Sequence, residues 1–148
     1  MNQLTVRANV LMRLWRDGNR LMLLREDYRK NLVVTAGKNH LASFLNSASA
    51  ISYMNFLAIG TGGSEAQLTD TALEAEIGTR VTATSSASTN VLRKTGTFAA
   101  GNGTGTIREV GLFSASSAGT MFARNAGFSP YVKGAGNLLD LIWDVHLD

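Results

Sequence analysis

Apolar and polar residues alternate along much of the chain, and this alternation predicts β-strands. In residues 4–14 the even positions are apolar and most odd positions are polar, a period of two that is typical of a half-buried strand. Residues 138–147 alternate in the same way. Further strands are expected at residues 21–28, 54–59, 79–84, 90–98, 106–113 and 120–126. Strands at this spacing, with turns between them, indicate a mainly β fold, either a β-sandwich or a barrel-like sheet.

Two segments depart from this period and favour short helices. Thr35 can cap a first helical turn, and the apolar residues that follow it recur at helical spacing: Leu41, Phe44, Leu45 and Ala48. This pattern predicts a helix that ends near Asn46. Residues 70–77 would place Leu73 and Ile77 on one side of a second short helix, so one or two helices are expected.

The first two strands are expected to form a hairpin. Residues 16–19 read Arg-Asp-Gly-Asn, and Asp-Gly readily adopts the positive φ angles of tight turns. Residues 1–30 are therefore expected to be an N-terminal β-hairpin arm, with its arginines mainly on one face. Residues 31–148 are expected to form the sandwich-like body of one compact domain, since no internal repeat or dividing linker is visible.

Positive charge is concentrated in this arm. The net charge is +3, but eight of the 14 Lys and Arg residues lie in residues 1–38, against three acidic residues. The candidate interaction residues are Arg7, Arg13, Trp15, Arg16, Arg20, Arg25 and Arg29. Three interpretations stay open: an acidic protein partner, a nucleic acid held through its phosphates and stacked bases, or a solvated face. Nucleic acid ranks behind a protein partner, because Glu26 and Asp27 interrupt the basic run.

Composition excludes several classes of protein. The chain of 148 residues has no cysteine, which excludes a disulfide framework, a thiolate metal site and cysteine catalysis. No apolar run approaches the roughly 20 residues of a membrane helix, and the first residues lack the pattern of a secretory signal. Only 17% of residues are charged, so neutral Ser, Thr and Gly must cover much of the surface. We expect a protein made in a reducing cytoplasm, without a membrane partner.

The glycine loop at residues 60–63 invites a nucleotide-binding interpretation that its neighbours do not support. A phosphate-binding loop of the Walker A type ends in Gly-Lys-Ser/Thr, whereas Ser64 and Glu65 follow here. We therefore expect a structural turn built on glycine backbone angles. His40 and His146 stand about a hundred residues apart, and a transition-metal site needs three or four converging ligands, so no metal site is expected.

Two pairs of carboxylates are the remaining catalytic candidates. Glu74 and Glu76 would point to different sides of a helix, whereas Asp140 and Asp144 share one face of a strand, with Trp143 pointing away. Glycosidases use paired carboxylates, but aromatic residues for sugar stacking are missing beside these. No Gly-x-Ser-x-Gly motif occurs. We expect no catalytic residue and no cofactor, with a small carbohydrate-binding or hydrolytic domain as a minor alternative.

Six segments in order make up a recognisable layout between Asn31 and Leu147. They are residues 31–39 (NLVVTAGKN), 58–63 (AIGTGG), 69–76 (TDTALEAE), 107–113 (IREVGLF), 119–124 (GTMFAR) and 142–145 (IWDV). In this order the chain resembles small structural proteins of tailed bacteriophages, and it is similar to the particle-attached N-terminal domains of phage tail fibres. Within residues 107–113 we expect a core strand with the side chains of Arg108 and Glu109 on opposite faces.

The resemblance implies a non-enzymatic virion protein assembled in the bacterial cytoplasm. Such a protein would be a homo-oligomer, with a trimer as one candidate stoichiometry, that packs neutral β surface against its neighbours. Because the chain ends soon after its last strand, without a shaft or tip, capsid decoration (cement) on the major capsid protein is favoured. A tail, neck or baseplate protein of the fibre-attachment type is the alternative. The competing class is a nucleic-acid-binding module that acts through the basic hairpin.

Overall fold

The computed structural model describes residues 5–46 and 52–148 and contains one helix and nine strands in these ranges. The helix is α1 (Thr35–Asn46). The strands are β1 (Val6–Trp15), β2 (Leu23–Val33), β3 (Phe56–Gly60), β4 (Glu76–Thr82), β5 (Thr84–Ser88), β6 (Val91–Phe98), β7 (Gly105–Phe113), β8 (Met121–Lys133) and β9 (Leu138–Leu147). The mainly β class is therefore confirmed.

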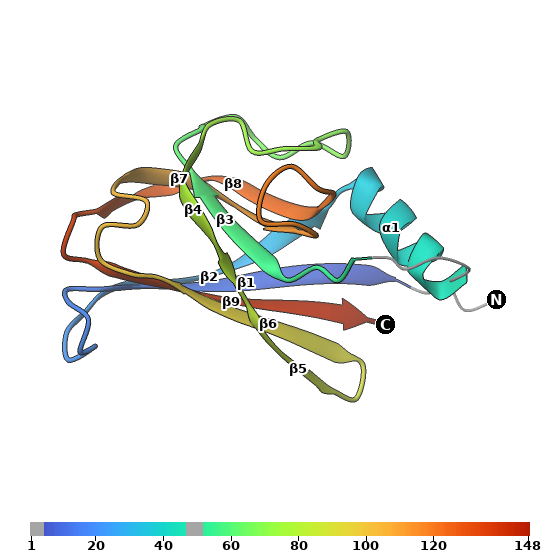
Figure 1. The fold of residues 1–148 in the computed structure, drawn as a ribbon, viewed down its shortest axis with the longest axis horizontal. Coiled ribbons are helices and arrows are strands. Elements are labelled where there is room, and N and C mark those ends of the chain that lie inside the picture. Colours follow the sequence, from blue (N-terminus) through green and yellow to red (C-terminus); the bar gives the residue numbers. More distant parts are fainter. Residues whose placement is uncertain (1–4, 47–51) are drawn as a thin grey trace.

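The nine strands form one antiparallel sheet in the order β4-β3-β7-β8-β2-β1-β9-β6-β5. The two strands at the ends of this order, β4 and β5, follow each other in the chain with only Ala83 between them. The sheet therefore curls back on itself into a nearly closed barrel, as Figure 1 shows. The narrowest junction lies between β2 and β8, which pair through Leu32 and Val33 alone.

Alternate residues of the strands fill the barrel. Val10 and Met12 of β1 and Trp143 of β9 are fully buried, as is Phe98 of β6. Val10 lies opposite Trp143 in the β1–β9 pairing, and residues directly opposite in a ladder point to the same face of a sheet. The alternation read in β1 and β9 thus supplies one continuous apolar interior.

The predicted hairpin is present, but it does not form a separable arm. β1 lies between β2 and β9 and pairs with β9 along all of its length, from Val6 opposite Leu147 to Trp15 opposite Leu138. The expectation of an arm over residues 1–30 is corrected for a physical reason. The apolar face that predicts a strand also requires neighbours that bury it, and β9 is one of them.

The turn of this hairpin also differs from the prediction. The residue with a positive φ is Arg20, at 56°, and Gly18 is not among the glycines with positive φ. The amide of Arg20 donates to the carbonyl of Asp17 at 3.3 Å, and the strand resumes only at Leu23. The loop is therefore wider than a two-residue Asp-Gly turn.

Helix α1 is confirmed and packs closely on the sheet. Gly37 is buried where the helix crosses β8, and a Cβ at this position would overlap the backbone carbonyl of Phe122. Leu41 packs against the core, whereas Leu45 is mostly exposed. Ala48, expected on the same helical face, lies outside the described residues.

The second predicted helix is absent from residues 70–77, which form an irregular, bent segment and the first two residues of β4. The amides of Glu74 and Ala75 donate to the carboxylate of Glu109, so they are not available for helical bonding. Two segments expected to be turns between strands belong to the sheet instead. Residues 85–88 form most of the exposed edge strand β5, and β8 continues beyond residue 126 through Pro130 to Lys133.

Candidate functional site

The arginines expected on one face of the hairpin are divided between two. Arg29 lies opposite Val10 and Arg25 opposite Leu14 in the β1–β2 pairing, so both follow the face that carries the core residues of β1. Arg13 alternates with these core residues and points the other way. The interpretation of a single basic face is therefore wrong.

Most of the candidate arginines are neutralised by carboxylates of the chain itself. The ion pairs are Arg7 with Asp148, Arg13 with Glu26, Arg20 with Asp140 and Arg25 with Asp27. The other two make weaker contacts. Arg16 donates a hydrogen bond to the sulfur of Met22 at 3.7 Å, and the guanidinium of Arg29 lies 5.9 Å from the centre of the Phe128 ring. The local excess of charge therefore offers little free cation to a partner.

Asp140 anchors the hairpin loop to the sheet. Its carboxylate accepts hydrogen bonds from Trp15 Nε1 at 2.9 Å, from the guanidinium of Arg20 through two bonds of 2.9 Å, and from Thr97 Oγ1 at 2.6 Å. Burial alone would raise the pKa of Asp140, but these hydrogen bonds and the charge of Arg20 outweigh it and lower the pKa. Asp144 is likewise held, by Arg93 through two bonds of 2.7 Å. Each carboxylate of this pair thus has a cationic partner within the chain.

The loop that Asp140 anchors carries an exposed apolar cluster. We call residues 16–24 the hairpin tip. Within it the exposed fractions are 84% for Leu21, 48% for Met22, 42% for Leu23 and 48% for Leu24. In Figure 1 the tip extends from the end of the barrel opposite α1. Contiguous exposed apolar residues are a common mark of an interaction site, and residues 21–24 are four exposed apolar residues in succession.

Sequence reasoning missed the hairpin tip because it assigned residues 21–28 to a half-buried strand. A signal was available, since residues 21–24 are four consecutive apolar residues. A half-buried strand alternates, so a run of this kind beside a turn must expose part of itself.

A buried carboxylate organises the opposite side of the barrel. Glu109 of β7 is fully buried and accepts hydrogen bonds from the amides of Gly62, Glu74 and Ala75 at 3.1, 3.0 and 2.7 Å. The guanidinium of Arg124, from β8, donates to the same carboxylate at 2.9 and 3.0 Å. The expectation that Glu109 and Arg108 lie on opposite faces is confirmed, because Arg108 is exposed.

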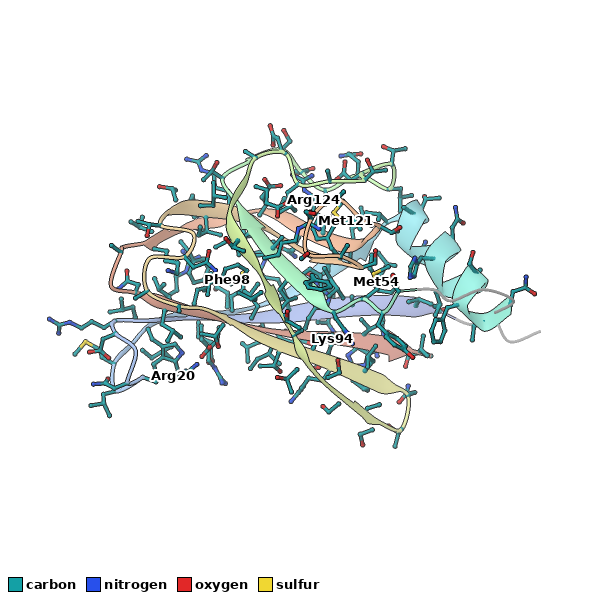
Figure 2. The ribbon with its side chains drawn as sticks, in the orientation of Figure 1. Arg20, Met54, Lys94, Phe98, Met121 and Arg124 are labelled. Carbon is teal, nitrogen blue, oxygen red and sulfur yellow. The ribbon has the colours of Figure 1, made fainter. Side chains whose placement is uncertain are left out.

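Arg124 extends this network to the loop before β4. It donates to Asp70 Oδ2 at 2.8 Å and to the carbonyl of Ser64 at 3.1 Å, and its side chain is 3% exposed. Figure 2 shows Arg124 on the upper side of the barrel, beneath this loop. We call Glu109, Arg124 and the groups that they bind the Glu109 network.

The glycine loop at residues 60–63 is part of the Glu109 network. A Cβ at Gly62 would lie 2.6 Å from Glu109 Oε1, and one at Gly60 would collide with the same oxygen. Neither glycine has a positive φ, so the explanation through backbone angles is wrong. Glycine is needed here because a carboxylate of the chain approaches the backbone closely.

The two histidines lie on different elements, His40 on α1 and His146 on β9. His40 Nε2 donates to the carbonyl of Ser52 at 2.8 Å, while His146 lies on β9. Over residues 5–46 and 52–148, no three His, Asp or Glu side chains are placed to hold a metal ion together. In the same ranges, no helix has both the length and the apolar character to span a membrane.

Comparisons with protein-family models, with curated proteins and with solved structures found no match to this chain. The structural features themselves define a class: a small antiparallel barrel with one docked helix and an apolar hairpin tip.

Proposed function

We propose that this chain is a non-enzymatic structural subunit of a tailed-phage particle, and that it docks through its hairpin tip. The observation that carries the proposal is the exposed apolar run Leu21–Leu24, which spans the end of the hairpin loop and the start of β2, next to Arg20, which is bonded to Asp140. Burying one such leucine in a partner is worth about 1.5–3 kcal/mol. Burial of several of these apolar side chains together would be enough for stable attachment, so docking would not need a large basic surface.

The placement of the phage-like segments is consistent with this proposal. Residues 58–63, 69–76, 107–113 and 119–124 lie in four separate parts of the chain, and each contributes a group to the Glu109 network. The resemblance therefore concerns residues that hold one fold together. It supports a shared architecture and assigns no chemistry to the chain.

A homo-oligomer is part of the proposal because the sheet keeps an open edge. All five residues of β5, Thr84–Ser88, are exposed, and β5 is the last strand in the order of the sheet. An edge strand without charged side chains is a natural place for another copy to pair. A trimer is the first stoichiometry to test, by light scattering coupled to size-exclusion chromatography.

Within this class, decoration of the capsid is proposed ahead of a tail, neck or baseplate position. Mass spectrometry of purified virions tests the class, and cryo-microscopy of the particle distinguishes the positions. Absence of the protein from the virions of the phage that encodes it would refute both.

The docking mode is tested by co-sedimentation of the purified protein with particles that lack it. The double variant Leu21→Ser/Leu23→Ser should lose binding, while Val132→Ser, at a residue 70% exposed outside the tip, should retain it. Wild-type binding should persist at high salt, because apolar burial is strengthened rather than screened by many salts. Unchanged binding by the double variant would contradict the proposal.

The nucleic-acid alternative makes the opposite prediction about salt. Binding through arginines releases counterions from phosphates and weakens steeply as salt rises. A filter-binding titration at low salt tests this alternative. The internal ion pairs of Arg7, Arg13, Arg20 and Arg25 argue against it.

A further inference from the structure

A pocket opens between α1 and the β6–β9 side of the barrel, far from the hairpin tip. Its volume is about 540 Å³, within the range of about 300–1,000 Å³ that is usual for small-molecule sites. The wall is largely apolar and includes Leu41, Phe44, Tyr53, Met54, Leu92 and Val145. The rings of Phe44 and Tyr53 lie 5.9 Å apart and join the helix to the segment before β3.

Lys94 is the one lysine, and there is no arginine, among the residues that line this largely apolar pocket. Its exposed fraction is 4%. The ammonium donates to Asn55 Oδ1 at 2.5 Å and to Ser85 Oγ at 2.6 Å, and both of these residues also line the pocket. Figure 2 shows Lys94 and Met54 on the side of the barrel toward α1.

Both hydrogen-bond acceptors of the Lys94 ammonium are neutral oxygens, so one N–H donor and the positive charge are left without a partner among the described residues. A lysine has three N–H donors, and no ion pair joins Lys94 to a carboxylate among the described residues. The segments outside the description, residues 1–4 and 47–51, contain no Asp or Glu. Burial lowers the pKa of Lys94, as expected where charge lacks a counter-charge.

The register of β6 determines that the side chain of Lys94 points into the barrel. On β6 it lies opposite Trp143 of β9 and Ser85 of β5, and Trp143 is fully buried, so all three point to the inner face. Lys133 offers a comparison. It is 1% exposed, donates to the carbonyl of Ala99 at 3.0 Å and is not part of the pocket wall.

We propose that this pocket binds a small amphipathic carboxylate, such as a fatty acid, with its head at Lys94 and its chain along Leu41, Phe44 and Leu92. A carboxylate would take the remaining donor of the ammonium and supply its missing counter-charge. The apolar wall suits an alkyl chain and disfavours sugars and nucleotides, which need many polar partners.

The carboxylate terminus of a peptide has the same head group but is not favoured. Proteins that capture such a terminus commonly surround it with backbone N–H groups. The polar neighbours of Lys94 are instead the side-chain oxygens of Asn55 and Ser85. A small molecule that needs one cation and an apolar cavity fits this arrangement better.

Calorimetric titration of the purified full chain tests the proposal with three probes of equal chain length. These are dodecanoate, 1-dodecanol and dodecyltrimethylammonium, each kept below its micelle-forming concentration. Dodecanoate should bind best, the alcohol about tenfold or more weakly, as expected for loss of a charge-assisted hydrogen bond, and the cation least. Equal binding of acid and alcohol, or no binding of the acid, would overturn the proposal.

Variants assign the head-group preference to Lys94. Lys94→Met should weaken dodecanoate binding about tenfold or more while leaving dodecanol binding unchanged. The matched control Lys133→Met should alter neither. If Lys94→Met does not fold, Met54→Trp at the pocket wall should abolish binding of both acid and alcohol. The proposal would be contradicted if Lys133→Met lost binding while Lys94→Met kept it. It would also be contradicted if a short peptide with a free apolar C-terminus bound more tightly than dodecanoate.

Discussion

Glu109→Ala removes the group that holds the loop of residues 61–75 onto the barrel. In the wild type, the carboxylate accepts three amide hydrogens, from Gly62, Glu74 and Ala75, as well as two bonds from Arg124. The substitution leaves all these donors without their acceptor. It also leaves Arg124, with a side chain 3% exposed, paired with only the carboxylates at the edge of the loop.

The expected loss of stability is large for a domain of this size. Removing one partner of a buried ion pair costs about 3–5 kcal/mol, and each amide left unsatisfied in the interior costs about 1–3 kcal/mol. Water can reach Glu74 and Ala75, whose bonds to Glu109 are only partly buried. Only the amide of Gly62 is then counted as buried, and we expect a total of about 4–8 kcal/mol, a large share of the roughly 5–15 kcal/mol by which domains are stable.

Urea unfolding followed by tryptophan fluorescence measures this loss, because Trp143 is fully buried and reports on the barrel. Hydrogen exchange gives an independent readout at single residues. The amides of Gly62, Glu74 and Ala75 should lose protection in Glu109→Ala, while those of β1 and β9 keep it. The double variant Glu109→Leu/Arg124→Met should be more stable than Glu109→Ala, because no unpaired charge remains buried.

A loss below about 1 kcal/mol would refute this reasoning, since it would equate the Glu109 network with an exposed ion pair. So would unchanged protection of the three amides. Glu109→Gln serves as the control of shape, because it keeps the size of the side chain and one acceptor oxygen. Its cost should lie between zero and that of Glu109→Ala.

Three further predictions concern other parts of the molecule. The pKa of Asp140 is lowered in the folded state, so its stabilising effect is present above its ordinary pKa and is lost as the pH falls through the lowered value. Asp140→Asn should therefore flatten the acid limb of the stability curve below about pH 5, measured by urea unfolding at each pH; an unchanged limb would contradict this. Gly37→Ala should destabilise the fold by about 2 kcal/mol or more, because its Cβ would overlap the carbonyl of Phe122; a melting temperature equal to that of the wild type would contradict the packing of α1. Thr89 has φ of 53°, so Thr89→Gly should raise stability by about 1 kcal/mol through relief of backbone strain, and a lower melting temperature would oppose this.

Local patterns were sufficient for several elements of the fold. The alternation in residues 138–147 predicted β9, whose bounds the structure places at Leu138–Leu147. Helix α1 was equally visible from Thr35 and the apolar spacing after it. In both elements the residues that determine the conformation are neighbours in the chain, so tertiary contacts reinforce the local preference.

Residues 70–77 illustrate why other elements could not be predicted. Their apolar spacing favours a helix, but the carboxylate of Glu109, more than thirty residues further along the chain, takes the amide hydrogens of Glu74 and Ala75. Propensity is a weak preference that a buried acceptor readily overrides. The sequence of residues 70–77 contains no signal from which the carboxylate of Glu109 could be predicted as their hydrogen-bond acceptor.

In the candidate sites, too, the residue types were visible in the sequence, whereas their partners were not. The Lys and Arg excess of the hairpin was visible in the sequence, but its neutralisation was not. Arg13 and Arg25 pair with Glu26 and Asp27 of the hairpin itself, whereas Arg7 and Arg20 pair with Asp148 and Asp140 near the other end of the chain. The pocket at Lys94 was missed because Arg93 and Lys94 are adjacent charges on one strand. Strand geometry sends them to opposite faces, one to solvent and one to the interior.

The sequence by itself determined the mainly β class, the positions of most strands, the first helix and the lack of cysteine chemistry, because these depend on periodicity and residue type. Only the tertiary structure decided that the hairpin lies inside the sheet, that the glycine loop receives an internal carboxylate, and that four consecutive apolar side chains are exposed at the hairpin tip. Each of these depends on which strands become neighbours. That choice is made by burial of the whole apolar surface at once, a property of the complete chain and not of any segment.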